Sequence, residues 1–177
     1  METATAVPDF PAFRERVLQA IRGTEQLNKL PYDHQPAILA AWSRLTGQPV
    51  DETFHLIPPV YSDHGINIRV GQHVFVNQGC RFNDIGGIEV GDHVMIGPDV
   101  SLISSGHPVT PSERRSGITA APIRIERNVW IGASAMILQG VTVGEDSVVG
   151  AGAVVTHDVP PGTLVVGSLA RVVRTIR

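Results

Sequence analysis

The sequence predicts an all-β solenoid, in which short strands wind into a coil of triangular cross-section. Aliphatic residues recur every six positions, first from Val70 and again from Ile125. The chain is also rich in turn-forming residues, with 18 glycines and 13 prolines, and only 5% of its residues are aromatic. A six-residue period does not match the stripe of a helix, and a hairpin sheet would show turns about every 8–12 residues.

Two short helices are expected before the repeat begins. The first carries an apolar stripe at a spacing of four and is expected to end at Gly23, and the second opens at Pro36 and stops at Gly47. They belong to an N-terminal helical segment, residues 1–54, followed by the solenoid domain, residues 55–177. Their expected apolar faces comprise Phe13, Val17, Ile21, Ile38, Leu39, Trp42 and Leu45.

The inward position of each hexapeptide, called position i, is expected to stack on its counterpart in the next coil. Position i+4 is small or medium-sized, which suits a place near a corner. Position i+1 is often glycine, which we interpret as backbone freedom at a bend. With a two-residue slip in its first half, the expected column is Val70, Val76, Phe82, Val90, Ile96, Leu102, Ile125, Ile131, Ile137, Val143, Val149 and Val155.

The repeat is interrupted over residues 103–122, which lack the period and are rich in Pro, Ser, Gly and Arg. This stretch is expected to leave the solenoid as a protruding loop. It opens with "SSGHP", so His107 lies where the chain turns off the coil. Ser104 and its neighbours favour a sharp turn, and Pro108 prevents the strand from resuming.

The hexapeptide pattern resembles that of the left-handed parallel β-helix of the hexapeptide-repeat acyltransferases. The motifs "SGHPV", "NVWIG" and "GAGAVVT" narrow the resemblance, which covers about residues 55–175, to the galactoside, maltose and nodulation-factor O-acetyltransferases. This resemblance implies a left-handed β-helix and acetyl-CoA as co-substrate. It also implies a homotrimer with sites between subunits, and direct acetyl transfer in a ternary complex to a hydroxyl of a sugar or related small molecule.

The resemblance also implies roles for particular residues. His107 matches the general base, because an imidazole with a pKa near neutrality can take the proton of an attacking alcohol. Asp63, Asn77 and Asp84 match places that bind acceptor hydroxyls, although Asn77 and Asp84 are equally interpretable as residues that satisfy turn backbone. Trp130 is interpreted as a wall of the pantetheine or acceptor pocket.

The expected contacts with acetyl-CoA are Ala133, Ala151, Thr156, His157, Arg171 and Arg174, the two arginines near the nucleotide phosphates. Three departures from the family pattern matter. Residue 133 is Ala where the family often has a hydroxyl, so an oxyanion contact there must come from backbone N–H. Residue 157 is His in place of lysine. Residues 1–25 do not match the acidic helical segment of sugar-specific members, which leaves the acceptor open.

Three other functions fit parts of the sequence. An antibiotic O-acetyltransferase uses the same fold, but usually with a larger insertion. A γ-type carbonic anhydrase would need zinc, and His73 and His93 lie about one coil apart. These two histidines are more simply explained as turn residues, so no metal is expected. A non-catalytic solenoid subunit is disfavoured by His107 and Trp130.

Composition excludes several partners. The net charge is −3 without a basic run, so no nucleic acid is expected. No apolar run approaches the roughly 20 residues of a membrane span, and the N-terminus lacks the pattern of a signal peptide. Cys80 is the single cysteine, which excludes an internal disulfide and fits a reducing compartment. A cytoplasmic location is therefore expected.

Overall fold

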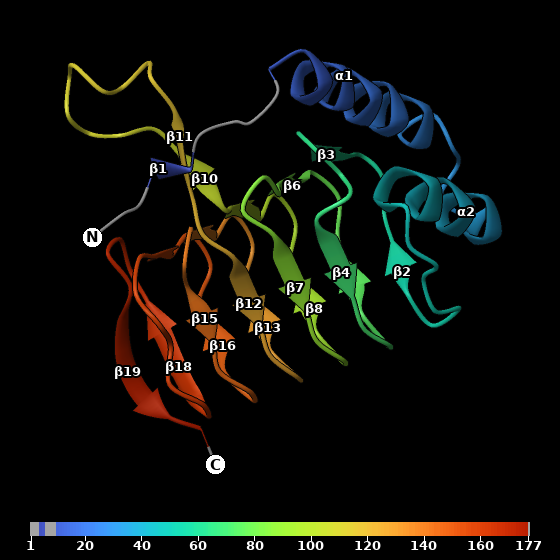
Figure 1. The fold of residues 1–177 in the computed structure, drawn as a ribbon. Coiled ribbons are helices and arrows are strands. Elements are labelled where there is room, and N and C mark those ends of the chain that lie inside the picture. The colour runs from blue at the N-terminus through green and yellow to red at the C-terminus, as the bar shows by residue number, and fades with distance from the viewer. Residues whose placement is uncertain (1–3, 6–9, 177) are drawn as a thin grey trace.

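The computed structural model describes residues 4–5 and 10–176, and these form a parallel β-helix with two helices at its N-terminal end (Figure 1). Each full coil contributes one strand to each of three sheets, and strands of successive coils pair in parallel. The predicted all-β solenoid is confirmed.

The three sheets are the faces of the solenoid. The four-stranded face contains β4 (Ile68–Val70), β7 (Ile88–Val90), β12 (Ile123–Ile125) and β15 (Thr142–Val143). The five-stranded face contains β3 (Val60–Ser62), β6 (Cys80–Asn83), β9 (Ser101–Ile103), β14 (Met136–Leu138) and β17 (Val154–Val155). The seven-stranded face contains β2 (His55–Leu56), β5 (Phe75–Val76), β8 (Met95–Ile96), β13 (Trp130–Ile131), β16 (Val148–Val149), β18 (Thr163–Val166) and β19 (Arg171–Thr175), the last antiparallel to β18.

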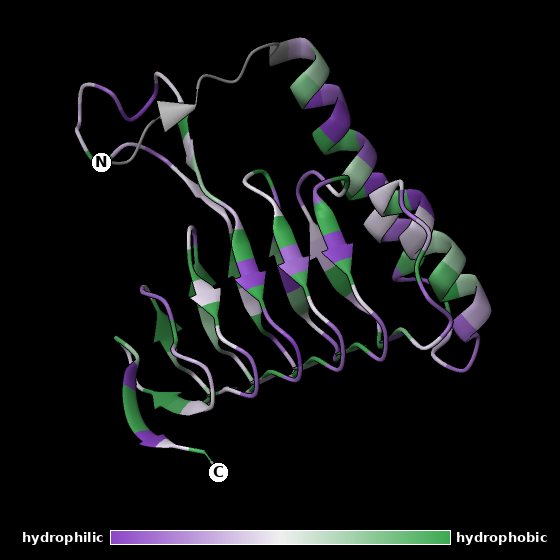
Figure 2. Ribbon diagram, turned by 60° about the horizontal axis from the view of Figure 1, so that its bottom comes forward, coloured by the Kyte–Doolittle hydropathy of each residue, from purple (hydrophilic) through white to green (hydrophobic). Residues whose placement is uncertain are grey.

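The predicted inward column is confirmed. The six position-i residues from Ile125 to Val155 are each at most 2% exposed, and those of the earlier block are also buried except Val70, which is half-buried near the start of the solenoid. Residues one position earlier point outward because side chains alternate along a strand. Figure 2 shows the result on the four-stranded face, where strands carry hydrophilic centres between hydrophobic ends.

The expected reason for the glycines at position i+1 is wrong. Left-handed backbone falls instead at position i+3, where His73, His93 and Asn128 have φ of 55°, 59° and 58°. The i+1 glycines allow coils to touch: a Cβ on Gly132 would lie 2.6 Å from the backbone nitrogen of Ala151 in the next coil. They are therefore required by close approach and not by an unusual φ.

The two helices differ in how well their ends were predicted. Helix α2 (Gln35–Thr46) has Pro36 in its first turn and ends at Gly47 with φ of 66°, as expected. Helix α1 (Phe10–Leu27) passes through Gly23, so the predicted end is wrong. Its packed face also differs, because Ile21 is 42% exposed; the buried residues of α1 are Ala20, Thr24 and Leu27.

Helix α2 closes the end of the solenoid core. The Trp42 ring lies 5.3 Å from that of Phe54 and 5.5 Å from that of Phe82, centroid to centroid, and all three side chains are buried. Neither described helix is both long and apolar enough to cross a membrane.

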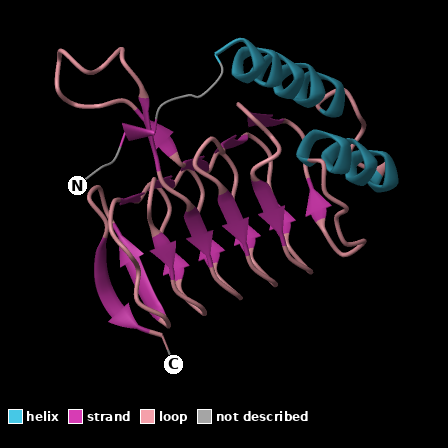
Figure 3. Cartoon of the chain, viewed as in Figure 1, coloured by secondary structure: helices cyan, strands magenta, loops and turns pink. Residues whose placement is uncertain are grey.

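The excursion leaves the five-stranded face after β9 and rejoins the solenoid at β12 (Figure 3). Its root is an antiparallel hairpin of β10 (Ser105–Gly106) and β11 (Ile118–Ala120). A short N-terminal strand, β1 (Ala4–Thr5), pairs with the other edge of β11. The sequence did not predict either pairing, and together they fix where the protruding loop starts.

Replacing Ile131 with Ala should lower the free energy of unfolding by about 2–5 kcal/mol, because it leaves a cavity in the fully buried column. Met136→Ala is the control, since that side chain is 38% exposed, and its cost should stay below about 1 kcal/mol. Urea denaturation measures both. Equal costs for the two variants would contradict the inward assignment.

Replacing Gly132 with Ala should cost about 1–3 kcal/mol, because the new methyl group collides with backbone that cannot rotate away. In Gly106→Ala the added Cβ lies 3.4 Å from the nearest atom, an ordinary contact, so that control should retain nearly parental stability. Thermal unfolding followed by circular dichroism compares them. A stable Gly132→Ala protein would refute the stacking explanation.

Candidate active site

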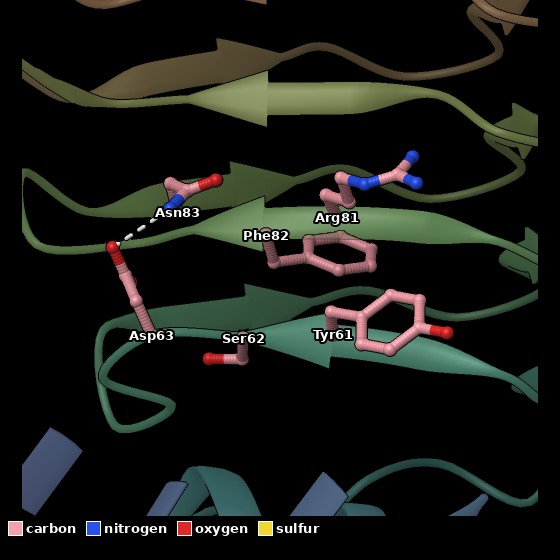
Figure 4. A pocket seen from close by; sticks show the side chains of 6 residues that line it. All are labelled: Tyr61, Ser62, Asp63, Arg81, Phe82 and Asn83. Carbon is pink, nitrogen blue, oxygen red and sulfur yellow. Dashed lines mark hydrogen bonds between the residues drawn. The ribbon is translucent and has the colours of Figure 1, made fainter. Parts of the chain in front are cut away.

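Strands β3 and β6 shape a cavity of about 220 Å³ on the outside of the five-stranded face (Figure 4). The two strands pair in parallel, so Tyr61 lies beside Arg81 in the register, and the turn after β3 brings Asp63 to the same end as Asn83. The lining residues are Tyr61, Ser62, Asp63, Arg81, Phe82 and Asn83.

The carboxylate of Asp63 is held at one end of this cavity. Its Oδ2 accepts a hydrogen bond from Nδ2 of Asn83 at 2.9 Å, and its Oδ1 accepts one from the backbone N–H of Asp84 at 2.8 Å. Burial raises the pKa of Asp63 from its ordinary 3.8 to about 6, although both hydrogen bonds lower it. Asp63 is thus placed to orient a hydroxyl, and its charge state changes under mildly acidic conditions.

Asp84 lies directly behind Asp63 but is completely buried. Its carboxylate accepts hydrogen bonds from the hydroxyl of Ser62 and from the backbone N–H groups of His64, Gly65 and Asn67. These bonds shape the loop after β3 and leave the carboxylate enclosed. The geometry favours the turn-satisfying interpretation of Asp84, and Asn83 presents the amide in the cavity instead.

Helix α1 supports the same loop from outside. Arg16 donates hydrogen bonds to the carbonyl of His64 at 2.7 Å and to that of Leu45 at 2.6 Å, which ties the loop to the end of α2. The Phe13 ring stacks on the His64 ring with centroids 5.6 Å apart. Burial lowers the pKa of His64, which favours a neutral ring there. The N-terminal segment therefore positions the neighbours of Asp63.

The root of the excursion is bonded to the cavity's polar end. The backbone N–H of Ser104 donates to the carbonyl of Asn83 at 2.9 Å, and the hydroxyl of Ser104 donates to the same oxygen at 2.6 Å. Three residues later His107 is exposed, and its Nδ1 lies 3.2 Å from the carbonyl oxygen of Gly117 across the loop. Since a carbonyl only accepts, Nδ1 is the donor in this contact, and Nε2 is the nitrogen that faces away from it.

Two expected site residues lie on or next to a different face. Trp130 is 51% exposed on the seven-stranded face, in register with Met95 and Val148. Asn77 lies in the turn after β5, where its side-chain oxygen accepts a hydrogen bond from the backbone N–H of Gln78 at 2.8 Å. Neither lines the cavity of Asp63, so one chain does not bring all the predicted acceptor residues together.

A second cavity of about 390 Å³ lies at the C-terminal end of the solenoid. His157 and Arg171 both line it, the latter from β19, together with Asp158. The hydroxyl of Thr156 is 2.8 Å from Nδ1 of His157. Two of the expected acetyl-CoA residues thus share a cavity, whereas Arg174 lies further along β19 and does not line it.

The other expected donor contacts form a stack at a different corner. The carbonyl oxygen of Ala133 accepts a hydrogen bond from the backbone N–H of Gly152 at 2.8 Å, so Ala133 and Ala151 occupy equivalent places in successive coils. Strand β17 separates this corner from Thr156 and His157. A ligand that touches both groups must therefore extend along the outside of the solenoid.

Groups that suggested other chemistry have ordinary explanations. Cys80 is buried, its thiol contacts the carbonyl of Gly97 at 3.3 Å, and burial raises its pKa to about 12, which removes it as a nucleophile. His73 and His93 stack with ring centroids 4.7 Å apart at the left-handed turn position. No set of three metal-ligating side chains occurs in residues 10–176 as the structure describes them.

Sequence reasoning missed Tyr61, Arg81 and Asn83. Arg81 and Asn83 flank the inward Phe82, so alternation along β6 would have placed both outside. The contact of His107 with Gly117 was also missed, because it depends on how the excursion folds back on itself.

Comparison with known proteins identifies the class. A family model described as "Hexapeptide repeat of succinyl-transferase" matches residues 122–157. The chain is 41% identical over 128 residues to galactoside O-acetyltransferase of Escherichia coli, covering 72% of this chain, and 47% identical over 116 residues to nodulation protein L of Rhizobium meliloti, covering 65%. The match spans 63% of the length of each of these two relatives.

Solved structures match over more of their length. A maltose O-acetyltransferase of Clostridium difficile gives a TM-score of 0.92 at 33% identity, covering 99% of this chain and 94% of that one. The acetyltransferase VCA0836 of Vibrio cholerae in complex with acetyl-CoA gives 0.82 at 33% identity, with coverage of 97% and 91%. A galactoside acetyltransferase in complex with coenzyme A gives 0.87 at 30% identity, with coverage of 99% and 88%.

These similarities define a hexapeptide-repeat transferase. The chain belongs to the hexapeptide-repeat acetyltransferase family, in the branch that includes galactoside and maltose O-acetyltransferases.

We expect the stability of the Asp63→Asn variant, measured relative to the parent, to rise as the pH rises. The folded chain keeps a proton on Asp63 between pH 4 and 6 that the unfolded chain has lost, so this group's contribution is fully present below pH 4 and disappears as the pH rises through 6. We expect the melting temperature of the variant, relative to the parent, to rise by roughly 2–4 °C between pH 4 and pH 7.

Differential scanning calorimetry at several pH values measures this difference. Asp33→Asn, an exposed substitution before α2, controls for the loss of one carboxylate elsewhere. A variant that differs from the parent by the same amount at every pH would contradict the burial of Asp63.

Proposed function

We propose that this protein transfers the acetyl group of acetyl-CoA to a hydroxyl of a sugar or a related small molecule. The observation that carries the proposal is the placement of His107. Its exposed imidazole contacts the carbonyl of Gly117 through Nδ1, at the root of an excursion that is bonded to the polar cavity of Asp63 and Asn83. The printed names of relatives, galactoside and maltose O-acetyltransferase, support a sugar as acceptor.

His107 is the general base in the proposed reaction. Its Nε2 removes the hydroxyl proton as the acceptor oxygen attacks the thioester carbonyl, which forms a C–O bond and places negative charge on the carbonyl oxygen. The backbone N–H of Ala133 stabilises that charge in this proposal, because the N–H groups of Gly132, Ser134 and Ala135 already donate to carbonyls of the coils. Collapse of the intermediate breaks the C–S bond, and the departing sulfur takes the proton from His107.

The acetyl group passes directly between the two substrates in this proposal. Burial and the raised pKa of Cys80 support a mechanism without an acyl-enzyme, because the single thiol of the chain is neither accessible nor ionised near neutrality. Asp63 and Asn83 orient the acceptor, and enclosed Asp84 holds their loop in shape.

The donor site is proposed along the C-terminal coils. Ala133 and Ala151 offer backbone to the pantetheine arm, and Trp130 forms a wall beside them. The cavity of His157 and Arg171 supports phosphate binding nearby, with Thr156 bonded to His157 and Arg174 further along β19. Structures of relatives in complex with acetyl-CoA and coenzyme A support this class of donor.

We infer that the working form is a homotrimer with sites between subunits. The outward column of the seven-stranded face is apolar over four successive coils and supports burial against a second copy. Trp130 and the turn of Asn77 would then reach the acceptor site of the neighbouring subunit. The residues of this apolar column are Phe75, Met95, Trp130 and Val148.

Replacing His107 with Ala should reduce turnover by roughly 100-fold or more, because no base then removes the acceptor proton. Thiol release from acetyl-CoA, measured with a panel of sugars, reports turnover, and the melting temperature should be unchanged because the side chain is exposed. His34→Ala, an exposed histidine before α2 without a side-chain capping bond, serves as the control. Near-parental turnover of the His107 variant would refute the assignment.

A further inference from the structure

Arg81 lies on the five-stranded face, and neither residue paired with it on the neighbouring strands is charged. In register, Arg81 lies between Tyr61 and Ser101. The equivalent ladder on the four-stranded face alternates in sign, with Glu89 between Arg69 and Arg124, and Arg124 forms an ion pair with Glu89 at 3.2 Å. Within the described chain no ion pair involves Arg81.

The guanidinium of Arg81 is nonetheless held in place. Its carbon lies 5.8 Å from the centroid of the Tyr61 ring, and Nη1 donates a hydrogen bond to the carbonyl of Gly79 at 3.2 Å. This single backbone bond leaves most of the five guanidinium N–H groups for a ligand. Stacking on an aromatic ring also reduces the entropy lost when a ligand binds.

Arg81 and the Asp63–Asn83 pair lie at opposite ends of one cavity. Residues two apart on a strand are separated by roughly 6.6 Å and face the same side, so Arg81 and Asn83 both face outward on β6. Figure 4 shows Arg81 at one end, Asp63 and Asn83 at the other, and the Tyr61 ring near the arginine end. A ligand that contacts both groups must therefore extend from one end of the cavity to the other, as a sugar ring with an acidic substituent does.

We propose that the acceptor is an anionic sugar, whose acidic group is bound by Arg81 while a hydroxyl of the same ring is held by Asp63 and Asn83. The inference rests on the proposed acetyl transfer and adds the charge class of the acceptor. A carboxylate or a phosphate fits the planar guanidinium, which offers two parallel N–H groups to two oxygens. The carboxylate of Asp63 repels the acidic group and so fixes which way round the ring enters.

The test compares galactose with two anionic sugars of the same ring: galacturonate, which carries a carboxylate at C6, and galactose 1-phosphate, which carries a phosphate and keeps the hydroxyls at C2, C3, C4 and C6. Thiol release from acetyl-CoA gives kcat/KM for each. We expect at least one anionic sugar to be preferred over galactose by 10-fold or more, and Arg81→Met to reduce that preference by 10-fold or more. Arg81→Lys keeps the positive charge but loses the two parallel N–H groups of the guanidinium, and it should retain part of the preference.

Arg69→Met is the matched control, because it removes an outward arginine from the four-stranded face, away from the cavity, and should keep the parental preference. The preference should also weaken as salt increases from 50 to 500 mM, since it depends on charge. A preference for the carboxylate over the phosphate, or the reverse, identifies the acidic group.

Ligand-observed NMR titration of the same sugars measures binding without turnover, so the two proposals can fail separately. Arg81-dependent binding of an anionic sugar without thiol release would overturn the acetyl transfer and keep this inference. Turnover in which neither anionic sugar is preferred over galactose, or in which Arg81→Met leaves the preference unchanged, would overturn the inference and keep the transfer.

Discussion

The contact between successive coils is the constraint on which the rest of this structure depends. Parallel strands of neighbouring coils lie about 4.8 Å apart, and at the i+1 corner that spacing leaves no room for a side chain on Gly132. The turn that follows requires left-handed backbone at i+3, which Asn, Asp and His adopt in this chain. With these two positions of each turn fixed, equivalent residues of successive coils lie directly above one another.

This vertical alignment builds the candidate site from segments far apart in sequence. Asp63 and Asn83 lie one coil apart and share a hydrogen bond, and Ser104 in the next coil donates to the carbonyl of Asn83. The two-residue slip falls at the same corner, where a Cβ on Gly86 would collide with the carbonyl of Ser104. The excursion therefore leaves a corner that is already rigid, which suits a loop that must hold His107 in one place.

The sequence predicted what is periodic and missed what is not. The burial of the column from Ile125 to Val155 was predicted from six consecutive repeats. Because all six show the same pattern, one ambiguous residue would not have changed the prediction. The end of α1 failed because a single glycine, Gly23, lies inside a helix that packs on α2, and tertiary contact outweighs its low propensity. The pairings of β10, β11 and β1 lie outside the hexapeptide repeat, so no periodic pattern in the sequence predicted them.

The contrast between periodic and non-periodic features also applies to the residues of the candidate site. Of the residues that motifs suggested, Asp63 and His157 line cavities and His107 lies in the excursion. The directions in which Asn83 and Asp84 face depend on the slip, which a motif does not reveal. Inward positions are similar on all three faces because they fill one core. The outward position before each inward residue is free to vary, and it makes one face a charged ladder, one an apolar column and one a cavity with Arg81. The chemistry that distinguishes this chain from another solenoid is therefore concentrated at these outward positions and in the excursion.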